Sequence, residues 1–502
     1  MSLAIKIKHS GKVYDITVDP SLNGLSLKEQ VATLTNVPTD RQKILVRGGP
    51  LKDDVKLNDV GLKAGQTVMV LGTPLEKVIS ETEAEKVQFV EDRQGAGAIV
   101  NGNLLGIPSG LVNLGNTCYL NSSIQLLHTI DELKGKLNSG NAGSSNALVK
   151  NTKELFAKIE SADGEKVTPL NFLSSVRNAF PQFQERSRDG FYKQQDAEEA
   201  YSQILNVLVT SFPDLKSYLN VELKKEMRCM EGTDGDEDVS YDYEDALKLN
   251  CHINSNVNFL IDGLKNGLTE TIEKHSDSLG RNAKYEIKRK IVKLPKYLTI
   301  NFVRFYWKRE TGKKAKIMRK VQFPFQLDVM ELVDDAERER LIKSRDEISK
   351  LEKEMEESYR SLKKQKLSGE SGSGSGSGSV SGAGAGSLTT REQYEQQKTD
   401  MKKMKEERAN KFGELFQRLG ASTGENASSL YDLVGIIAHQ GASAESGHYQ
   451  AFIKDEADLT GSRWYRFNDD VVTIIDREKI LALAGGSEGD SALVLLYKGV
   501  GM

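Results

Sequence analysis

The feature that most constrains the fold of this chain is Cys118, a cysteine at the predicted start of a helix. It directly follows the run NLGNT at 113–117, and apolar residues recur after it at the spacing of a buried helix face, at Leu120, Ile124 and Leu127. The unpaired N–H groups and the dipole of a helix start favour an anion, so they lower the pKa of a cysteine there from about 8.5. We therefore expect Cys118 to be a nucleophile; the alternative is the buried, inert role of most cysteines.

A thiol nucleophile needs a general base, and His448 is the best candidate in the sequence. It opens a predicted strand, 449–453, whereas its rival His439 ends an apolar strand and is better explained as a packed residue before a loop. The segment 440–447 is polar and bounded by glycine, which is typical of a loop that can move across a cleft. Because His448 and Cys118 lie in distant parts of the chain, the tertiary fold has to bring them together.

A thiol hydrolase also needs a group that orients the imidazole and a donor that stabilises an oxyanion. Asn468 and Asp469 follow a predicted aromatic strand, 464–467, and strand alternation places their side chains on opposite faces. Either side chain can accept the imidazole N–H, although an Asn-Asp pair is also a common β-turn. Asn113 is a candidate oxyanion donor beside the backbone N–H of Cys118. Together these residues predict thiol-dependent hydrolysis of an acyl bond.

The composition argues against several other classes of protein. The net charge of -3 gives no reason to expect nucleic acid or a membrane surface as partner, and no apolar run approaches the ~20 residues that span a bilayer. The first residues lack the apolar segment of a signal peptide. The three cysteines form no C-x-x-C pair, so we expect neither a metal site nor a cofactor. Their small, odd number indicates a reducing compartment, the cytoplasm or the nucleus.

The 502 residues are too many for one ordinary domain, and we expect two domains and a linker. Residues 1–75 predict a hairpin, a helix opened by a capping box at Ser26, and two further strands. This β-grasp order resembles ubiquitin-like domains, and the alternative is another small α+β domain. Residues 76–105 contain the run GAGA and are expected to be a flexible linker. In 106–500 the helices precede most of the strands, which indicates an α+β domain.

The second domain carries a predicted insert at 333–419. Two densely charged segments with apolar residues at helical spacing flank a Gly/Ser-rich tether at 368–387. We expect an antiparallel helical hairpin whose tether cannot bury enough apolar surface to order itself. The tether could also be an engineered splice, which the sequence does not decide.

Three motifs between 106 and 498 together resemble the ubiquitin-specific protease family. Residues 113–121 are similar to its Cys box, residues 447–449 with 464–471 to its His box, and residues 191–199 to a motif that opens a helix beside the cleft. The resemblance implies a papain-like thumb–palm–fingers fold. It also implies an isopeptidase that cleaves after the C-terminal Gly-Gly of ubiquitin.

The same resemblance implies a role for each candidate residue. Cys118 is the nucleophile, His448 the base and Asn468 the imidazole partner. Asn113 is the oxyanion donor. Many relatives carry Asp at position 468, so whether the adjacent Asp469 shares the role of imidazole partner stays open.

The resemblance further implies contacts to the arginine-bearing tail of ubiquitin from Gln195, Asp196 and Tyr449. For Asp196 a second role is equally well supported, because Asp-Ala-Glu-Glu at 196–199 is a good capping sequence for the helix that follows. Both roles can hold at once.

A ubiquitin-like domain on a member without zinc-binding cysteines resembles the proteasome-associated branch of the family, as do the runs VRFYWK at 303–308 and DSAL at 490–493. This branch implies docking on the proteasome regulatory particle through the ubiquitin-like domain, removal of ubiquitin from bound conjugates, and allosteric modulation of the proteasome. It also implies that two loops, about 306–317 and 440–446, obstruct the cleft until docking. We therefore expect weak activity in isolation and a monomer outside the complex.

Two other functions fit parts of the sequence. The charged insert, the ubiquitin-like domain and the amide of Asn468 fit a non-catalytic scaffold that binds ubiquitin. A protease for another ubiquitin-like modifier would use the same catalytic residues. Covalent capture by ubiquitin-based and other modifier-based electrophilic probes separates these functions.

Overall fold

The computed structural model describes residues 3–71 except 10–11, 36, 38, 40–41 and 47–48, and residues 107–502 except 140–145, 232–238, 309–312, 371–389, 444–445, 457, 459–460 and 487–488. The chain divides into two compact units, Met1–Val90 and Glu91–Met502. The predicted linker, 76–105, lies outside the described residues, as does most of the predicted tether, 368–387.

The first unit is a mixed sheet packed against helix α1. The sheet runs in the order β2, β1, β5, β3 and β4, with β1 parallel to β5 and the other pairs antiparallel. Its elements are β1 (Leu3–His9), β2 (Lys12–Val18), α1 (Gly24–Thr35), β3 (Lys43–Val46), β4 (Gly49–Pro50), the short 3-10 helix η2 (Leu57–Val60) and β5 (Thr67–Leu71). This is the predicted β-grasp order. The helix begins at Gly24, before the predicted capping box, because Asn23 Oδ1 accepts the N–H of Ser26 at 3.1 Å.

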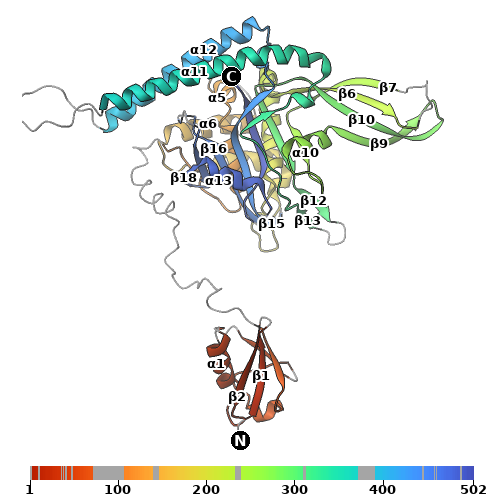
Figure 1. Ribbon diagram of the computed structural model, residues 1–502, viewed down its shortest axis with the longest axis vertical. Coiled ribbons are helices and arrows are strands. Elements are labelled where there is room, and N and C mark those ends of the chain that lie inside the picture. Colours follow the sequence, from red (N-terminus) through yellow and green to blue (C-terminus); the bar gives the residue numbers. More distant parts are fainter. Residues whose placement is uncertain are drawn as a thin grey trace, which may run out of the picture. The chain divides into compact units, whose positions relative to one another are not determined.

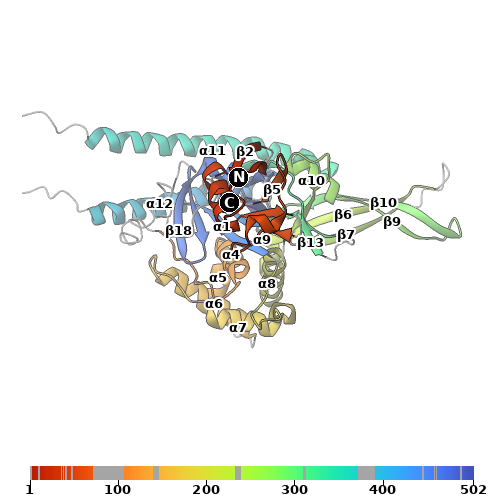
Figure 2. The same cartoon turned by 90° about the horizontal axis from the view of Figure 1, so that it is seen from below.

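The second unit is built on a mixed central sheet, and helices α4 to α8 gather on one side of it (Figures 1 and 2). The sheet runs in the order β18, β17, β16, β15, β19, β11 and β8, and β14 pairs with β15. Its strands are β8 (Leu249–His252), β11 (Tyr297–Val303), β14 (Gln326–Asp328), β15 (Leu430–Ser443), β16 (Ser446–Lys454), β17 (Arg463–Asn468), β18 (Val471–Asp476) and β19 (Ser491–Gly499). The helices that precede the sheet in the chain are α4 (Cys118–Leu127), α5 (Asp131–Asn138), α6 (Ala147–Ser161), α7 (Leu170–Ala179), α8 (Ala197–Ser211) and α9 (Lys216–Leu219).

The central sheet has a hydrophobic core on each face, because its middle strands are apolar on both sides. One core joins helices α4 to α8 to Ile437 of β15 and Val494 of β19. The other core joins Ile436 and Leu495 of the same strands to α10 (Leu260–Gly267), α13 (Arg477–Leu481) and their neighbours. The helical half and the strand-rich half of the sequence therefore meet across one sheet, as an α+β domain requires.

Two projections extend from this body in opposite directions (Figures 1 and 2). One is an antiparallel sheet in the order β7, β6, β10 and β9, made of β6 (Val221–Cys229), β7 (Val239–Ala246), β9 (Thr269–Ser276) and β10 (Arg281–Lys293). The other is the insert, with α11 (Asp335–Glu370) and α12 (Thr390–Arg418). Arg408 pairs with Glu352 at 2.6 Å and Arg418 with Glu347 at 2.5 Å, an order that makes the two helices antiparallel, as predicted. Within the described part of the chain, no helix has the length and apolar character needed to cross a membrane.

The two segments expected to be polar loops at the cleft are mostly strands. Residues 305–308 and 313–316 pair as β12 (Phe305–Lys308) and β13 (Lys313–Lys316). The second segment continues β15 to Ser443 and starts β16 at Ser446. The expectation of loops is thus wrong for the described part of both segments, because antiparallel backbone pairing continues almost to their tips; residues 309–312 and 444–445 lie outside the described part.

The close approach of α4 to the sheet gives a stability test at Gly435. A Cβ at this position would lie 2.3 Å from Leu126 Cδ1 and 3.1 Å from Ile453 Cδ1, so Gly435→Ala has to displace the fully buried side chain of Leu126. We expect it to lower the free energy of unfolding of the second unit by about 1–3 kcal/mol. The control is Gly413→Ala in α12, where a Cβ meets nothing within 4 Å and helix propensity favours alanine. Urea unfolding of both variants measures the difference, and equal stability of the two would contradict this account of the packing.

Candidate active site

Cys118 begins α4, as predicted, and the side chain of Asn113 organises the loop before it. Asn113 Oδ1 accepts the N–H groups of Gly115 at 2.9 Å and Thr117 at 3.3 Å. Gly115 and Asn116 have positive φ angles of 95° and 52°, a conformation that glycine and asparagine tolerate best. The Gly-Asn pair is therefore the local reason why the chain turns sharply into the helix at Cys118.

The thiol of Cys118 is only 3% exposed, and burial raises its pKa to about 11. The backbone N–H of Tyr449 lowers the pKa, the carboxylate of Asp469 raises it, and the N–H groups of Tyr119 and Cys118 lower it again. The expectation of a low thiol pKa is therefore wrong for this conformation, because the loss of hydration outweighs the helix start. The thiol stays protonated at neutral pH until a base removes its proton.

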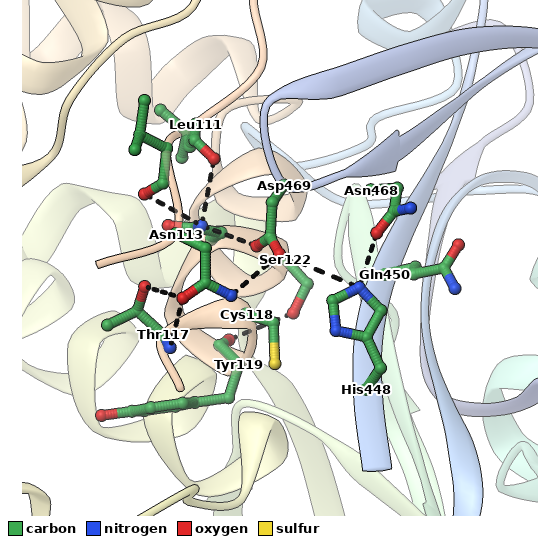
Figure 3. Close-up of polar contacts among 12 residues, drawn as sticks. Leu111, Asn113, Thr117, Cys118, Tyr119, Ser122, His448, Gln450, Asn468 and Asp469 are labelled. Carbon is green, nitrogen blue, oxygen red and sulfur yellow. Dashed lines mark hydrogen bonds and ion pairs between the residues drawn. The ribbon is translucent and has the colours of Figure 1, made fainter. Parts of the chain in front are cut away.

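His448 lies at the start of β16, and Asn468 ends the neighbouring strand β17. His448 Nε2 is 2.6 Å from Asn468 Oδ1 and 3.8 Å from Asp469 Oδ2. When Nε2–H is donated to Asn468, the other ring nitrogen, Nδ1, is the acceptor, and Figure 3 draws it on the side of the Cys118 sulfur. Of the two candidates, Asn468 is the nearer partner of the imidazole.

Asp469 connects the sheet to the loop that precedes α4. Its Oδ1 accepts Nδ2–H of Asn121 at 2.8 Å, and its Oδ2 accepts Nδ2–H of Asn113 at 2.9 Å (Figure 3). Its backbone oxygen accepts the N–H of Leu111 at 2.9 Å. The φ of Asp469 is 53°, so the residue has left the strand and the predicted alternation with Asn468 does not apply. A Cβ at Gly110 would lie 2.7 Å from the Asp469 oxygen, which explains the glycine there.

The loop before α8 brings an amide to the thiol, and it comes from Gln194 rather than Gln195. Gln194 Nε2 donates to Cys118 Sγ at 3.8 Å. Gln195 Nε2 instead donates to the backbone oxygen of Gln182 at 3.1 Å. Asp196 Oδ1 accepts an N–H of the first turn of α8 at 2.9 Å, so this side chain has the capping role that the sequence left open.

Tyr449 was expected to contact the ubiquitin tail, but its side chain belongs to the core. It is 1% exposed and packs on the ring of His439, with ring centroids 4.7 Å apart. Its neighbour His439 is also buried, as the sequence predicted for a packed residue. Only the backbone of Tyr449 is therefore available at the thiol, and the side-chain contact has to be corrected.

Sequence reasoning missed two residues of this site, Gln194 and Asn121. Asn121 lies one helical turn after Cys118, and it is buried together with the polar residues Ser122 and Gln125, so burial on the helix did not single it out. Nor does any signal in the sequence distinguish Gln194 from Gln195, because the choice depends on the backbone direction of the loop. Among the described residues, no group of three or more histidine, cysteine, aspartate or glutamate side chains could hold a metal ion.

The fold and this site define a thiol hydrolase that carries a separate β-grasp unit. The family model described as ubiquitin carboxyl-terminal hydrolase matches residues 109–497, and the ubiquitin family model matches residues 5–75. Relatives with these names cover almost the whole chain: ubiquitin carboxyl-terminal hydrolase 6 of Schizosaccharomyces pombe is 40% identical over 99% of both chains, and ubiquitin carboxyl-terminal hydrolase 14 of Caenorhabditis elegans is 31% identical over 98% of this chain and 93% of its own. Ubiquitin carboxyl-terminal hydrolase 7 of Arabidopsis thaliana is 34% identical over 99% and 98%.

The chain belongs to the ubiquitin carboxyl-terminal hydrolase family and is a cysteine-type deubiquitinase with an N-terminal ubiquitin-like domain. This confirms the family, the α+β fold class and the thiol-dependent enzyme class predicted from the sequence.

The buried thiol gives a pH-dependent prediction for the protein without ubiquitin. Because only the thiolate reacts and the pKa of Cys118 is about 11, alkylation of Cys118 by iodoacetamide should be slow near pH 7 and rise about tenfold per pH unit up to about pH 9. Mass spectrometry of the Cys118 peptide measures the rate, and the half-buried Cys229 is an internal comparison. A fast rate that is independent of pH would instead reveal a thiolate already paired with an imidazolium.

The adjacent glutamines give a matched pair of variants. Gln194→Ala removes an amide donor from the sulfur, so we expect kcat to fall roughly tenfold, the typical effect of one hydrogen bond to a charged group. Gln195→Ala should leave kcat within about twofold of wild type, since its amide donates elsewhere. Hydrolysis of a ubiquitin C-terminal fluorogenic amide measures both. The reverse ranking would contradict a role of Gln194 at the sulfur.

Proposed function

We propose that Cys118, His448, Asn468 and Asn113 form the catalytic centre of this deubiquitinase. The observation that carries the proposal is the pair of bonds from Asp469 to Asn113 and Asn121, which holds the loop before the thiol against the turn that follows Asn468. In this arrangement the nucleophile and the amide donor come from one segment, 113–118, and the imidazole comes from β16, while Asp469 holds the first segment against the turn that follows β17.

The chemistry follows from the protonation states. His448 Nδ1 removes the proton of the Cys118 thiol, and the sulfur attacks the carbonyl carbon of the C-terminal glycine of ubiquitin. The backbone N–H of Cys118 and the second amide hydrogen of Asn113 stabilise the oxyanion. The imidazolium, held through Nε2–H by Asn468, then protonates the leaving amine of the substrate lysine. Water hydrolyses the resulting thioester and frees the thiol.

Docking on the proteasome regulatory particle through the ubiquitin-like domain is the second part of the proposal. A row of three apolar residues and one lysine crosses the outer face of that sheet, because Lys8 pairs with Val13 on β2 and with Met69 on β5, and Met69 pairs with Leu45 on β3. The side chains of Val13, Met69 and Leu45 are 54%, 47% and 39% exposed. Exposed apolar side chains beside lysines favour a protein partner with an apolar surface and an acidic rim.

On this proposal the enzyme acts in the cytoplasm and the nucleus as a monomer that joins the proteasome and removes ubiquitin from bound conjugates. The raised pKa of the Cys118 thiol supports weak activity before docking, since little thiolate is present. Occupation of the proteasome by the enzyme would also modulate the larger machine. The scaffold function therefore accompanies catalysis, and a dead site is disfavoured by the complete set of catalytic groups.

A kinetic comparison with and without proteasomes tests both parts. Wild-type enzyme should release fluorophore slowly from a ubiquitin C-terminal amide and faster once proteasomes are added, while Cys118→Ala should be inactive in both assays. Met69→Asp should keep the basal rate and lose the stimulation, and Leu22→Asp, an exposed control elsewhere in the same unit, should keep both.

Equal release by wild type and Cys118→Ala would refute the catalytic centre. Full wild-type turnover that does not change on adding proteasomes, or a Met69→Asp variant that is stimulated normally, would refute the docking proposal. A ubiquitin C-terminal electrophilic probe adds an independent check, because its covalent capture at Cys118 counts against a non-catalytic scaffold.

A further inference from the structure

A buried lysine lies where the β12–β13 hairpin meets the end of β15. Lys316, the last residue of β13, is only 6% exposed. Its Nζ donates to the backbone oxygens of His439 at 2.7 Å and Gly441 at 3.0 Å, and lies 3.1 Å from His439 Nδ1. An ammonium has three donors, and all three have acceptors here, which is the condition for keeping a charge in such a site.

His439 extends this contact to the strand that carries His448. Its ring packs against Phe305 at the start of β12 and against Tyr449, the residue after His448, with centroid distances of 5.5 Å and 4.7 Å. Its Nε2 lies so close to Gly447, the residue before His448, that a Cβ there would be 2.7 Å away. Gly447 and Tyr449, the residues on both sides of His448, thus pack against the ring of His439, and Lys316 contacts that same ring.

The strand ladder alone does not fix this end of the sheet. Gln440 pairs with His448, but the register between β15 and β16 then shifts, and the next pair is Ser443 with Ser446. The Gly441 oxygen falls within this irregular stretch and receives its hydrogen bond from Lys316. The position of His448 therefore depends on a side-chain contact as well as on backbone pairing.

The charge of Lys316 has a counterpart behind His448. Asp490 is a partly buried carboxyl whose pKa is raised, because the effect of burial outweighs the opposing effects of Arg466, His448 and Lys316. Gln450 links Asp490 to Arg466, since its Nε2 donates to Asp490 at 3.5 Å and its Oε1 accepts from Arg466 at 2.6 Å. The buried ammonium thus acts electrostatically on Asp490, which is hydrogen-bonded to Gln450 of β16, the strand of the proposed base.

We propose that Lys316 is a positioning residue for the deubiquitinating reaction: by joining the β12–β13 hairpin to His439 and Gly441, it fixes the segment of β16 from which His448 reaches the thiol. This inference rests on the proposed role of His448 as the base. On this inference, Lys316 and His439 connect the β12–β13 hairpin to the segment that carries the catalytic imidazole of His448. The connection affects the chemical step more than the binding of ubiquitin, since Lys316 itself is buried.

Steady-state hydrolysis of a ubiquitin C-terminal fluorogenic amide by full-length variants tests the inference. Lys316→Met keeps the apolar stem and removes the ammonium, so kcat should fall about tenfold or more while KM stays within about twofold. Lys316→Arg retains a cation and should recover most of kcat. His439→Phe keeps a ring of similar shape and removes the Nδ1 acceptor, so it should lower kcat in the same way. Lys320→Met, an exposed lysine nearby, is the matched control and should behave as wild type.

The unfolding midpoint of each variant identifies those that fold, and His439→Phe serves if Lys316→Met does not. Folded Lys316→Met or His439→Phe with the kcat of Lys320→Met would overturn the inference. His448→Ala, measured in parallel, separates it from the proposed catalytic centre. If His448→Ala keeps wild-type kcat, the catalytic centre itself is wrong; if His448→Ala is inactive and Lys316→Met is normal, only the positioning role fails.

Discussion

The geometry of the site depends on the hydrogen bonds that the carboxylate of Asp469 accepts. Asp469 accepts amide hydrogens from Asn113 and Asn121, which flank Cys118, and its backbone holds Leu111. Hydrogen bonds to a charged acceptor contribute about 1.5–3 kcal/mol each, enough to fix the relative position of the two segments that they join. This one turn of the sheet therefore sets where the helix of the thiol stands relative to the strand of the imidazole. The role differs from that of a simple imidazole partner, which the neighbouring Asn468 fills more closely.

Two opposing effects act on the thiol, and their magnitudes decide its state. A helix start stabilises an anion by about 0.3–1 kcal/mol at an exposed site. A pKa of about 11 means that the protonated thiol is favoured by roughly 3 kcal/mol more than in an ordinary cysteine. Burial is the main cause of this difference. The enzyme thus keeps its nucleophile protonated and weakly reactive. A change that moves the imidazole, or a hydrogen-bond donor, closer to the sulfur would favour the thiolate and so raise activity strongly. The amide of Gln194, a residue of the enzyme itself, already donates a hydrogen bond to the sulfur.

Local signals in the sequence predicted the elements well. The Gly-Asn turn fixed the start of α4 at Cys118, and the apolar run at 297–303 coincides with β11, because both depend on short-range backbone preferences and burial pattern. Predictions were wrong where two residues close in sequence could fill the same role, or where a residue distant in sequence makes the deciding contact. Asn23 replaced Ser26 as the cap of α1. Residues 305–308, 313–316 and 440–443 form strands instead of the expected loops, because antiparallel pairing with a neighbouring strand satisfies their backbone groups.

The sequence by itself determined the inventory of the site: a thiol at a helix start, a histidine at a strand start, amides and acids at fixed positions, and the order of the two domains. Only the tertiary structure decided which groups meet. It brought the amide of Gln194 to the thiol, placed Asn468 nearer to the imidazole than Asp469, moved the side chain of Tyr449 into the core, and reversed the expected direction of the thiol pKa. The physical reason is that side-chain direction and desolvation are set by neighbours from remote parts of the chain, whereas helix starts and strand patterns are set by residues close in sequence.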